Sequence, residues 1–220
     1  MESLREEEYL KAFEIAKSNF LSSDYKKRCR IAGAIWEPTV KGGVIHLPFF
    51  NEICRINIPD FKFFLISNQE EPNLTNKILI LHYLNGVKDI PLSETDISFK
   101  EVPSGEFYYP AFVRRSIEPI LRTFGQEVEV FKTVAEQLGG QIVEKGDVGI
   151  RVHIFPKVPV TLIYWEGDDE FPPDLNILFD ATIKEFLSTE DIAVIAQEIM
   201  IRMNKLYFRY ETNRGLTDRN

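Results

Sequence analysis

The sequence predicts one α+β domain, with a mixed or antiparallel sheet and four or five packed helices. Segments with apolar residues at helical spacing and segments rich in β-branched and aromatic residues come in blocks, without strict alternation. The chain has 220 residues, 44% hydrophobic and 12% aromatic, which is enough to bury a full core. No repeat, low-complexity stretch or linker interrupts it, so we expect a single domain over residues 1–220.

The first third of the chain predicts a helix followed by short strands. Residues 2–22 carry apolar side chains three or four positions apart, with acids before lysines, as suits a helix and its dipole. Prolines and a glycine pair then divide a β-prone stretch, which predicts strands joined by turns. We expect these strands at 44–50, 54–58 and 62–66.

Helices and strands are expected in turn over the rest of the chain. A helix from Asn73 or Thr75 ends at Asn85-Gly86, and the last helix, over about 189–208, is capped by Ser188 or Thr189. Residues 211–220 are expected to fray. The remaining expected helices are 109–125, kinked at Pro119, and 126–140; the expected strands are 96–99, 141–146, 149–155, 158–167 and 177–180.

Charge and cysteine content restrict the function classes. The chain has 26 Lys and Arg against 34 Asp and Glu, a net charge of -8, which argues against a nucleic-acid surface and against binding to anionic lipid. No apolar run approaches the roughly 20 residues that cross a bilayer. The acidic N-terminus and the two cysteines, Cys29 and Cys54, indicate a cytoplasmic protein without a disulfide framework.

An acidic segment over 166–174 places five carboxylates within nine residues. One interpretation is a site for a hard cation or for acid–base chemistry, with Asp168, Asp169 and Glu170 as oxygen donors. The spacing does not match an EF-hand loop. The other interpretation is a solvated loop whose carboxylates face water.

The three histidines, His46, His82 and His153, stand in no zinc-binding motif. His82 lies on an apolar helix, where it is either a buried histidine with a hydrogen-bond partner or an axial ligand or proton carrier. His46 lies on an expected strand, from which it could reach a carboxylate across the sheet. Cys29 stands among basic residues that would lower its pKa if it were exposed; the alternative is a structural thiol.

Aromatic and basic residues occur together before the middle of the chain. Tyr108 and Phe112 precede Arg114, a combination that can hold a carboxylate, a phosphate or a flat ligand. The alternative is that the arginines pair with acids of the 166–174 segment. No phosphate-binding glycine loop and no nucleophile elbow is present.

Four segments of the chain carry a family resemblance: 78–115, 136–140, 155–180 and 186–192. They resemble a family of uncharacterised proteins from anaerobic bacteria and archaea, classed as a domain of unknown function, over roughly residues 8–205. Some relatives resemble this chain joined to a short cysteine-rich iron–sulfur segment, which is missing here. The resemblance implies an accessory role in anaerobic one-carbon, corrinoid or tetrapyrrole metabolism, with any iron–sulfur cluster on a partner protein. The residues in the family motifs are His82, Tyr83, Gly105, Tyr108, Phe112, Arg114, Gly139, Gly140, Asp147, Pro156, Pro159, Trp165, Asp168, Glu170, Phe171, Phe179 and Asp180.

Three functional hypotheses follow. The first is an accessory protein that binds a corrinoid or haem-like tetrapyrrole, or an iron–sulfur or corrinoid partner. The second is a hydrolase or lyase that uses a divalent cation at the acidic segment, with Arg114 as an anion clamp. The third is a homodimeric interaction module that uses the terminal helix. The candidate ligand-binding residues are His82, Tyr108, Phe112, Arg114, Trp165, Asp168, Glu170 and Asp180.

Overall fold

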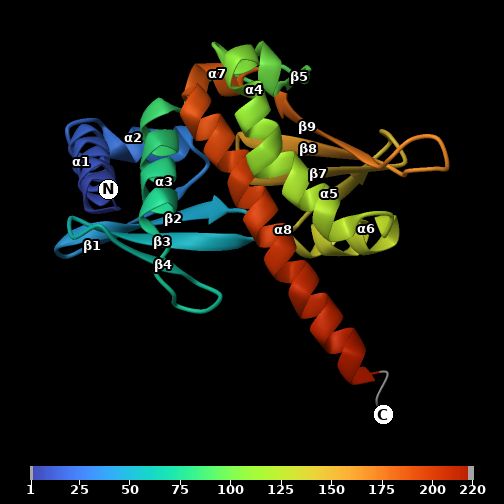
Figure 1. Ribbon diagram of the computed structural model, residues 1–220. Coiled ribbons are helices and arrows are strands. Elements are labelled where there is room, and N and C mark those ends of the chain that lie inside the picture. The colour runs from blue at the N-terminus through green and yellow to red at the C-terminus, as the bar shows by residue number, and fades with distance from the viewer. Residues whose placement is uncertain (1, 218–220) are drawn as a thin grey trace.

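The computed structural model describes residues 2–217 and confirms the α+β class (Figure 1). It corrects two details of the prediction. The strands form two antiparallel sheets instead of one, and the helices exceed the expected four or five. The buried side chains of both halves nevertheless form one continuous hydrophobic core. No helix in the described range is long and apolar enough to cross a membrane.

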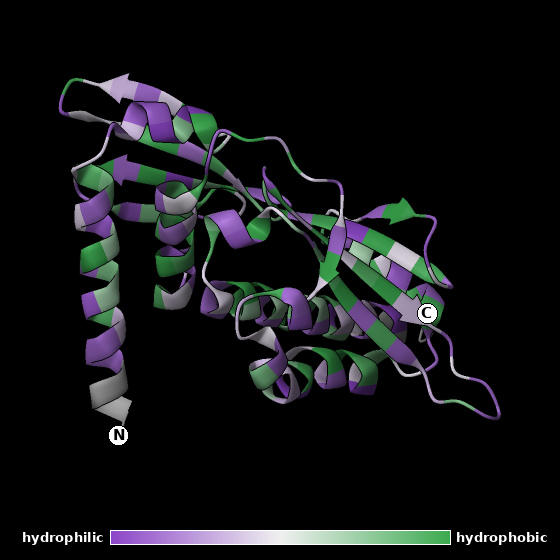
Figure 2. Ribbon diagram, turned by 90° about the horizontal axis from the view of Figure 1, so that it is seen from above, coloured by the Kyte–Doolittle hydropathy of each residue, from purple (hydrophilic) through white to green (hydrophobic). Residues whose placement is uncertain are grey.

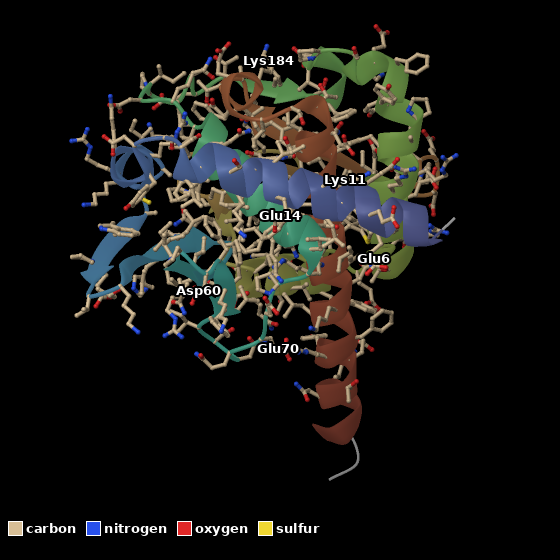
Figure 3. The ribbon with its side chains drawn as sticks, turned by 90° about the vertical axis from the view of Figure 1, so that its left-hand side faces the viewer. Glu6, Lys11, Glu14, Asp60, Glu70 and Lys184 are labelled. Carbon is tan, nitrogen blue, oxygen red and sulfur yellow. The ribbon has the colours of Figure 1, made fainter. Side chains whose placement is uncertain are left out.

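The N-terminal sheet, sheet A, has the strand order β1-β2-β3-β4, and each strand is antiparallel to its neighbour. Its buried face packs against helix α1 through the aromatic pairs Phe13–Phe63 and Phe20–Phe61. Figure 3 shows α1 from its outer side, where Glu6, Lys11 and Glu14 are labelled. The elements are α1 (Glu2–Leu21), α2 (Tyr25–Ile31), β1 (Ile35–Thr39), β2 (Gly42–Phe49), β3 (Glu52–Ile58), β4 (Lys62–Leu65) and α3 (Leu74–Gly86).

The second sheet, sheet B, has the order β5-β9-β8-β7-β6 and is also antiparallel throughout. Its central strand β8 is buried along almost its whole length, as its β-branched and aromatic sequence favours. The strands are β5 (Asp96–Ser98), β6 (Gln141–Val143), β7 (Val148–Phe155), β8 (Val158–Trp165) and β9 (Asp174–Asp180). The helices of this half are η1 (Phe99–Glu101), α4 (Gly105–Phe112), η2 (Val113–Ile117), α5 (Glu118–Phe124), α6 (Val128–Gln137), α7 (Ile183–Phe186) and α8 (Thr189–Thr217).

The expected kink at Pro119 takes the form of a short π-helix. Segment η2 is π-helical and joins α4 to α5, and Pro119 lies at the start of α5. Proline has no N–H to donate, and its ring crowds the preceding turn, so a wider turn ahead of it removes the conflict. The two helices therefore follow one another without a loop.

Helix α8 is longer than predicted. It extends to Thr217 instead of ending near residue 208, so residues 211–217 are helical; residues 218–220 lie outside the described range. Ile192, Ile195, Ile199 and Met203 are fully buried, which makes its first half a core helix. In Figure 1 this helix runs between α3 and the α4–α5 pair, and its C-terminal end extends beyond the sheets.

Tyr83 of α3 lies where the two halves of the protein meet. Its hydroxyl donates to the carbonyl oxygen of Ala32 at 2.9 Å and accepts from the backbone N–H of Lys157 at 3.3 Å. Its ring stacks on Phe155 of β7, with centroids 4.2 Å apart and planes 4° from parallel. The side chain is fully buried, so one residue satisfies a carbonyl of the N-terminal half and an amide of the β7–β8 turn at once.

We expect Tyr83→Phe to lower the free energy of unfolding by about 1–3 kcal/mol, because the stacked ring is kept while two buried backbone groups lose their partner. Urea denaturation measures this change. The control is Tyr108→Phe, since Tyr108 is exposed and the same atom is removed; its effect should stay within about 0.5 kcal/mol. Equal effects of the two substitutions would contradict the role given to the Tyr83 hydroxyl.

Candidate functional site

A histidine–aspartate–serine chain joins α3 to the start of α8. His82 Nδ1 lies 2.7 Å from Asp191 Oδ1. The other oxygen of Asp191 accepts from the Ser188 hydroxyl at 2.6 Å and from the Ser188 backbone N–H at 3.1 Å. A carboxylate only accepts, so Nδ1 carries the proton and the tautomer of the imidazole is determined by this contact.

Local sequence explains how these three residues come to their places. Asn73 caps α3 by accepting from Asn76 N at 2.8 Å, and the helix then buries most of its side chains, leaving His82 at a partly exposed position. Ser188 caps α8, and its hydroxyl accepts from Asp191 N at 3.1 Å. The exchange of hydrogen bonds between a serine cap and an acid three residues later is a capping box, which holds the Asp191 carboxylate at the start of α8 and leaves its second oxygen for His82 of α3.

The second ring nitrogen of His82 remains available. The His82 side chain is 37% exposed, whereas that of Asp191 is 11% exposed. Nε2 has no hydrogen-bond partner among the described residues. It is also not shielded from solvent. The site thus presents one imidazole nitrogen to solvent, held in orientation by a buried carboxylate.

The pair shifts the pKa values of both groups. The hydrogen bond to Asp191 raises the pKa of His82 above 6.5, against the opposing effect of burial. Burial by itself raises the pKa of Asp191, but the hydrogen bonds from His82 and Ser188 outweigh it and hold that pKa below 3.8.

These shifts make the stability contribution of the pair depend on pH. The His82 contribution is complete below pH 6.5 and is lost as pH rises through the raised pKa. The Asp191 contribution is complete above pH 3.8 and is lost as pH falls through the lowered pKa. The pair therefore stabilises the fold most between these two values.

An imidazole backed by a carboxylate suits two kinds of chemistry. It can exchange a proton near neutral pH, or it can ligate a metal, because metal-binding histidines usually donate their other N–H to a carboxylate or carbonyl. Among residues 2–217, no group of three or more His, Cys, Asp or Glu side chains could hold a metal ion.

Two of the predicted ligand-binding residues have structural contacts instead. Phe112 is buried and stacks on Phe99, with centroids 4.2 Å apart. Asp180 accepts hydrogen bonds from backbone and hydroxyl groups of Ser93 and Thr182 and from the backbone of Glu94, and so closes the segment before β5 onto the end of β9. Its carboxylate oxygens are engaged within the chain.

The acidic segment follows β8 as an exposed loop. Asp168 accepts from the backbone N–H groups of Glu170 and Phe171 at 2.8 and 2.7 Å, which lowers its pKa. Asp169 and Glu170 are exposed, and Trp165 at the end of β8 is 44% exposed. In this structure the carboxylates face water and do not converge on a common point.

Tyr108 and Arg114 lie on the surface of the α4–η2 segment. Tyr108 is 53% exposed, beside the exposed ring of Phe107 at a centroid distance of 5.1 Å. Arg114 is exposed and makes no ion pair within the described part of the chain, so it does not pair with the acidic loop. Neither residue belongs to the hydrogen-bond chain of His82.

The two remaining sequence hypotheses have opposite outcomes. Cys29 is buried and its pKa is raised to about 12 by burial, so the reactive-thiol interpretation is wrong and the thiol is structural. His46 Nε2 lies 3.1 Å from Glu37 Oε2 on the neighbouring strand, which confirms the cross-strand contact.

Sequence reasoning missed the partner of His82. It placed the cap of the last helix at Ser188 or Thr189, but 109 residues separate Asp191, in the first turn of that helix, from His82. The capping pattern shows that the carboxylate is held at the helix start, and it says nothing about which helix lies opposite.

The comparisons with known proteins assign the family. Two antiparallel sheets on one core, with a histidine oriented at a helix start, define an α+β domain with a candidate ligand site. The chain belongs to the family described as Domain of unknown function (DUF3786), whose model matches residues 24–202. That range includes His82, Ser188 and Asp191 and leaves out the whole of α1. No curated protein and no solved structure matched.

We expect the pKa of His82 to lie above 6.5 in the wild type and to fall in Asp191→Asn, because the amide keeps the shape of the carboxylate but carries no charge. NMR titration of the imidazole carbons measures both values. His153 is the internal control, since burial and Arg151 lower its pKa below 6.5 and it should not respond to the substitution. An unchanged His82 pKa in Asp191→Asn would show that the pair does not form in solution.

Proposed function

We propose that this protein is a non-catalytic accessory protein that presents His82 Nε2 as a ligand to the metal of a corrinoid or haem-like tetrapyrrole carried by a partner protein. The observation that supports this proposal is the half-exposed imidazole fixed by Asp191, whose other nitrogen is free. His82 would hold such a group through Nε2, and the imidazole would tune the electronics of its metal. The metabolic setting implied by the family resemblance agrees with this class of cofactor.

The distribution of the other candidates favours a cofactor held mainly by a partner. Phe112 is in the core and Tyr108 is a surface residue of α4, so these aromatic residues do not line a cradle around His82. A tetrapyrrole enclosed by this chain alone would need such an apolar cradle. The residues present fit a single axial contact, which a cofactor exposed on another protein can reach.

The contact between His82 and Asp191 determines how the binding of a metal by His82 would depend on pH. His82 would bind a metal through Nε2 only when that nitrogen carries no proton, and the Nδ1–H would keep its hydrogen bond to Asp191. Because Asp191 raises the pKa of His82, binding should weaken progressively as pH falls through that raised pKa. Serine and aspartate together would keep the ring in orientation after the proton has left.

The test uses aquocobalamin and haemin, added separately to the purified protein at pH 8, with the visible spectrum as the readout. We expect a saturable spectral shift in the wild type and none in His82→Ala. His46→Ala and His153→Ala remove the other two histidines and should leave the shift intact. Asp191→Asn should weaken binding about 10–100-fold, as expected for loss of the group that orients a ligand.

Two outcomes would reject the proposal: a wild-type spectrum that does not change at about 100 μM protein and cofactor, or a shift that persists in His82→Ala. Thermal denaturation of each variant accompanies the titrations, because Asp191 also accepts from the cap of α8. A variant that melts with the wild type and fails to bind separates ligation from folding.

A further inference from the structure

The C-terminal part of α8 extends beyond the two sheets and presents an exposed face (Figure 1). On its inner side the ring of Tyr207 packs edge-on against Phe124 of α5, at a centroid distance of 5.1 Å. Side chains three and four positions apart form the exposed side, because such residues are neighbours on a helix surface. We call this side the α8 face, and its residues are Ile201, Lys205, Phe208, Arg209 and Thr212.

The α8 face combines positive charge with an apolar ring. Lys205 and Arg209 flank Phe208, which is 64% exposed, and the three side chains line a shallow hollow. Neither cation forms an ion pair in the described part of the chain, and no carboxylate from that part lines the hollow. The one acid in the sequence of this part of α8, Glu211, pairs with Arg214 at 3.7 Å. The hollow therefore offers two unpaired cations beside an exposed aromatic ring.

The acidic loop between β8 and β9 has the complementary character. Asp169, Glu170 and Phe171 are exposed, Phe171 at 67%, and the carboxylates of the loop form no ion pair within the described range. Asp168 closes the turn by accepting from the backbone N–H groups of Glu170 and Phe171. The loop is thus held in shape before any contact, which lowers the entropy lost on binding. Figure 2 shows it at the right-hand edge of the view, mainly in the colour of hydrophilic residues.

The acidic loop and the α8 face of one chain extend in different directions. In Figure 1 the orange loop extends to the right of sheet B, and the end of α8 extends downward from the sheets. The two surfaces therefore do not meet within one chain, although each carries the charges that the other lacks. Both remain open to another molecule.

We propose that this protein associates with a second copy of itself, the acidic loop of one copy docking on the α8 face of the other with Phe171 in the hollow. Charge complementarity supports this occupant, because Asp169 and Glu170 would meet the two unpaired cations of the hollow around an apolar centre. Two copies docked by their α8 faces would instead bring like charges together. The terminal helix of one copy thus contacts a loop of the next, not the same helix.

The inference does not rest on the function proposed for His82. Its partner Asp191 lies in the first turn of α8. At about 1.5 Å per residue, Phe208 lies roughly 25 Å farther along the helix. The contact between copies therefore leaves the imidazole available, and His82→Ala should associate as the wild type does.

Sedimentation velocity of the full chain tests the contact, with the weight-average mass as the readout. We expect the mass to rise with concentration at low salt, with a dissociation constant of about 100 μM or tighter. Association should weaken at about 0.15 M salt, because the screening length falls to about 8 Å there.

Charge reversal on each side locates the contact. The helix variant, Lys205→Glu with Arg209→Glu, and the loop variant, Asp169→Lys with Glu170→Lys, should each weaken self-association at least about tenfold. A mixture of the two variants should associate, because the first keeps the acidic loop and the second keeps the α8 face. A chain with all four substitutions should also associate with itself, because the charges have been exchanged. Asp168 is left unchanged, since it closes the turn.

Matched controls carry the same changes of charge elsewhere. Lys26→Glu with Lys27→Glu alters exposed positions of α2, and Glu6→Lys with Glu7→Lys alters exposed positions of α1. Both should associate as the wild type does.

The apolar part of the contact has its own pair of variants. Phe171→Ala should weaken association at least about fivefold, because the ring fills the hollow. Phe107→Ala removes a ring of α4 that is 81% exposed and should leave association unchanged.

Four results would overturn the inference. They are a wild type that stays monomeric at about 1 mM, a helix variant that associates as the wild type does, equal losses in the controls, and a mixture of the two charge-reversed variants that stays monomeric. A monomeric wild type would make an acidic segment of a different protein the occupant that fits the α8 face. Circular dichroism of each variant shows whether a loss of association arises from unfolding.

Discussion

The packing of Tyr83 against Phe155 is the contact on which the arrangement of the two sheets depends. Antiparallel sheets of four and five strands have separate ladders, and the core must be continued from one to the other by side chains. The Tyr83 ring does this by stacking, and its hydroxyl satisfies backbone groups on both sides, at Ala32 and Lys157. A backbone hydrogen bond from Phe50 to Ile154, at 2.9 Å, joins β7 to the turn after β2 nearby.

The candidate site depends on the same helix. Tyr83 and His82 are neighbours on α3, so anchoring Tyr83 in the core leaves His82 directed toward α8 at the surface. The capping box of α8 completes the site from the other side, because the carboxylate that closes the cap also accepts from the imidazole. The Asp191 carboxylate of the helix cap therefore also orients the His82 imidazole, a potential metal ligand.

The two proposed surfaces have different physical character. The His82 site is a single oriented nitrogen with a titratable partner, and it suits a contact governed by coordination and proton loss. The α8 face carries unpaired cations beside an exposed ring, and it suits a contact governed by charge and burial. The outer face of sheet A, in contrast, mixes apolar and charged side chains around a hollow that Glu37 helps to line. An accessory protein that associates with a second copy while presenting a ligand to a cofactor would use both proposed surfaces.

The amino-acid sequence by itself determined the class of fold and most of the elements, although α2, β1 and α7 were not predicted. Helical spacing located α1, the start of α8 and the end of α3 at Gly86, and the β-prone runs located β2, β3 and β4, because these patterns depend on residues close in sequence. The sequence allowed a contact of His46 with a carboxylate across the sheet but did not name Glu37, because no strand was predicted over residues 35–39. The length of α8 was underestimated, because its last turns carry charged and aromatic side chains without a clear apolar stripe.

Only the tertiary structure decided which of the candidate residues meet. Two of these outcomes depend on contacts between segments that are far apart in sequence: the pairing of His82 with Asp191 and the hydrogen bonds to Asp180. The burial of Phe112 and Cys29 depends on which face of a helix turns toward the core. The division into two sheets likewise depends on long-range strand order, which alternation of residue type does not specify. Local sequence patterns indicate the secondary structure and the chemistry available to a residue. Tertiary packing determines which other residue it contacts.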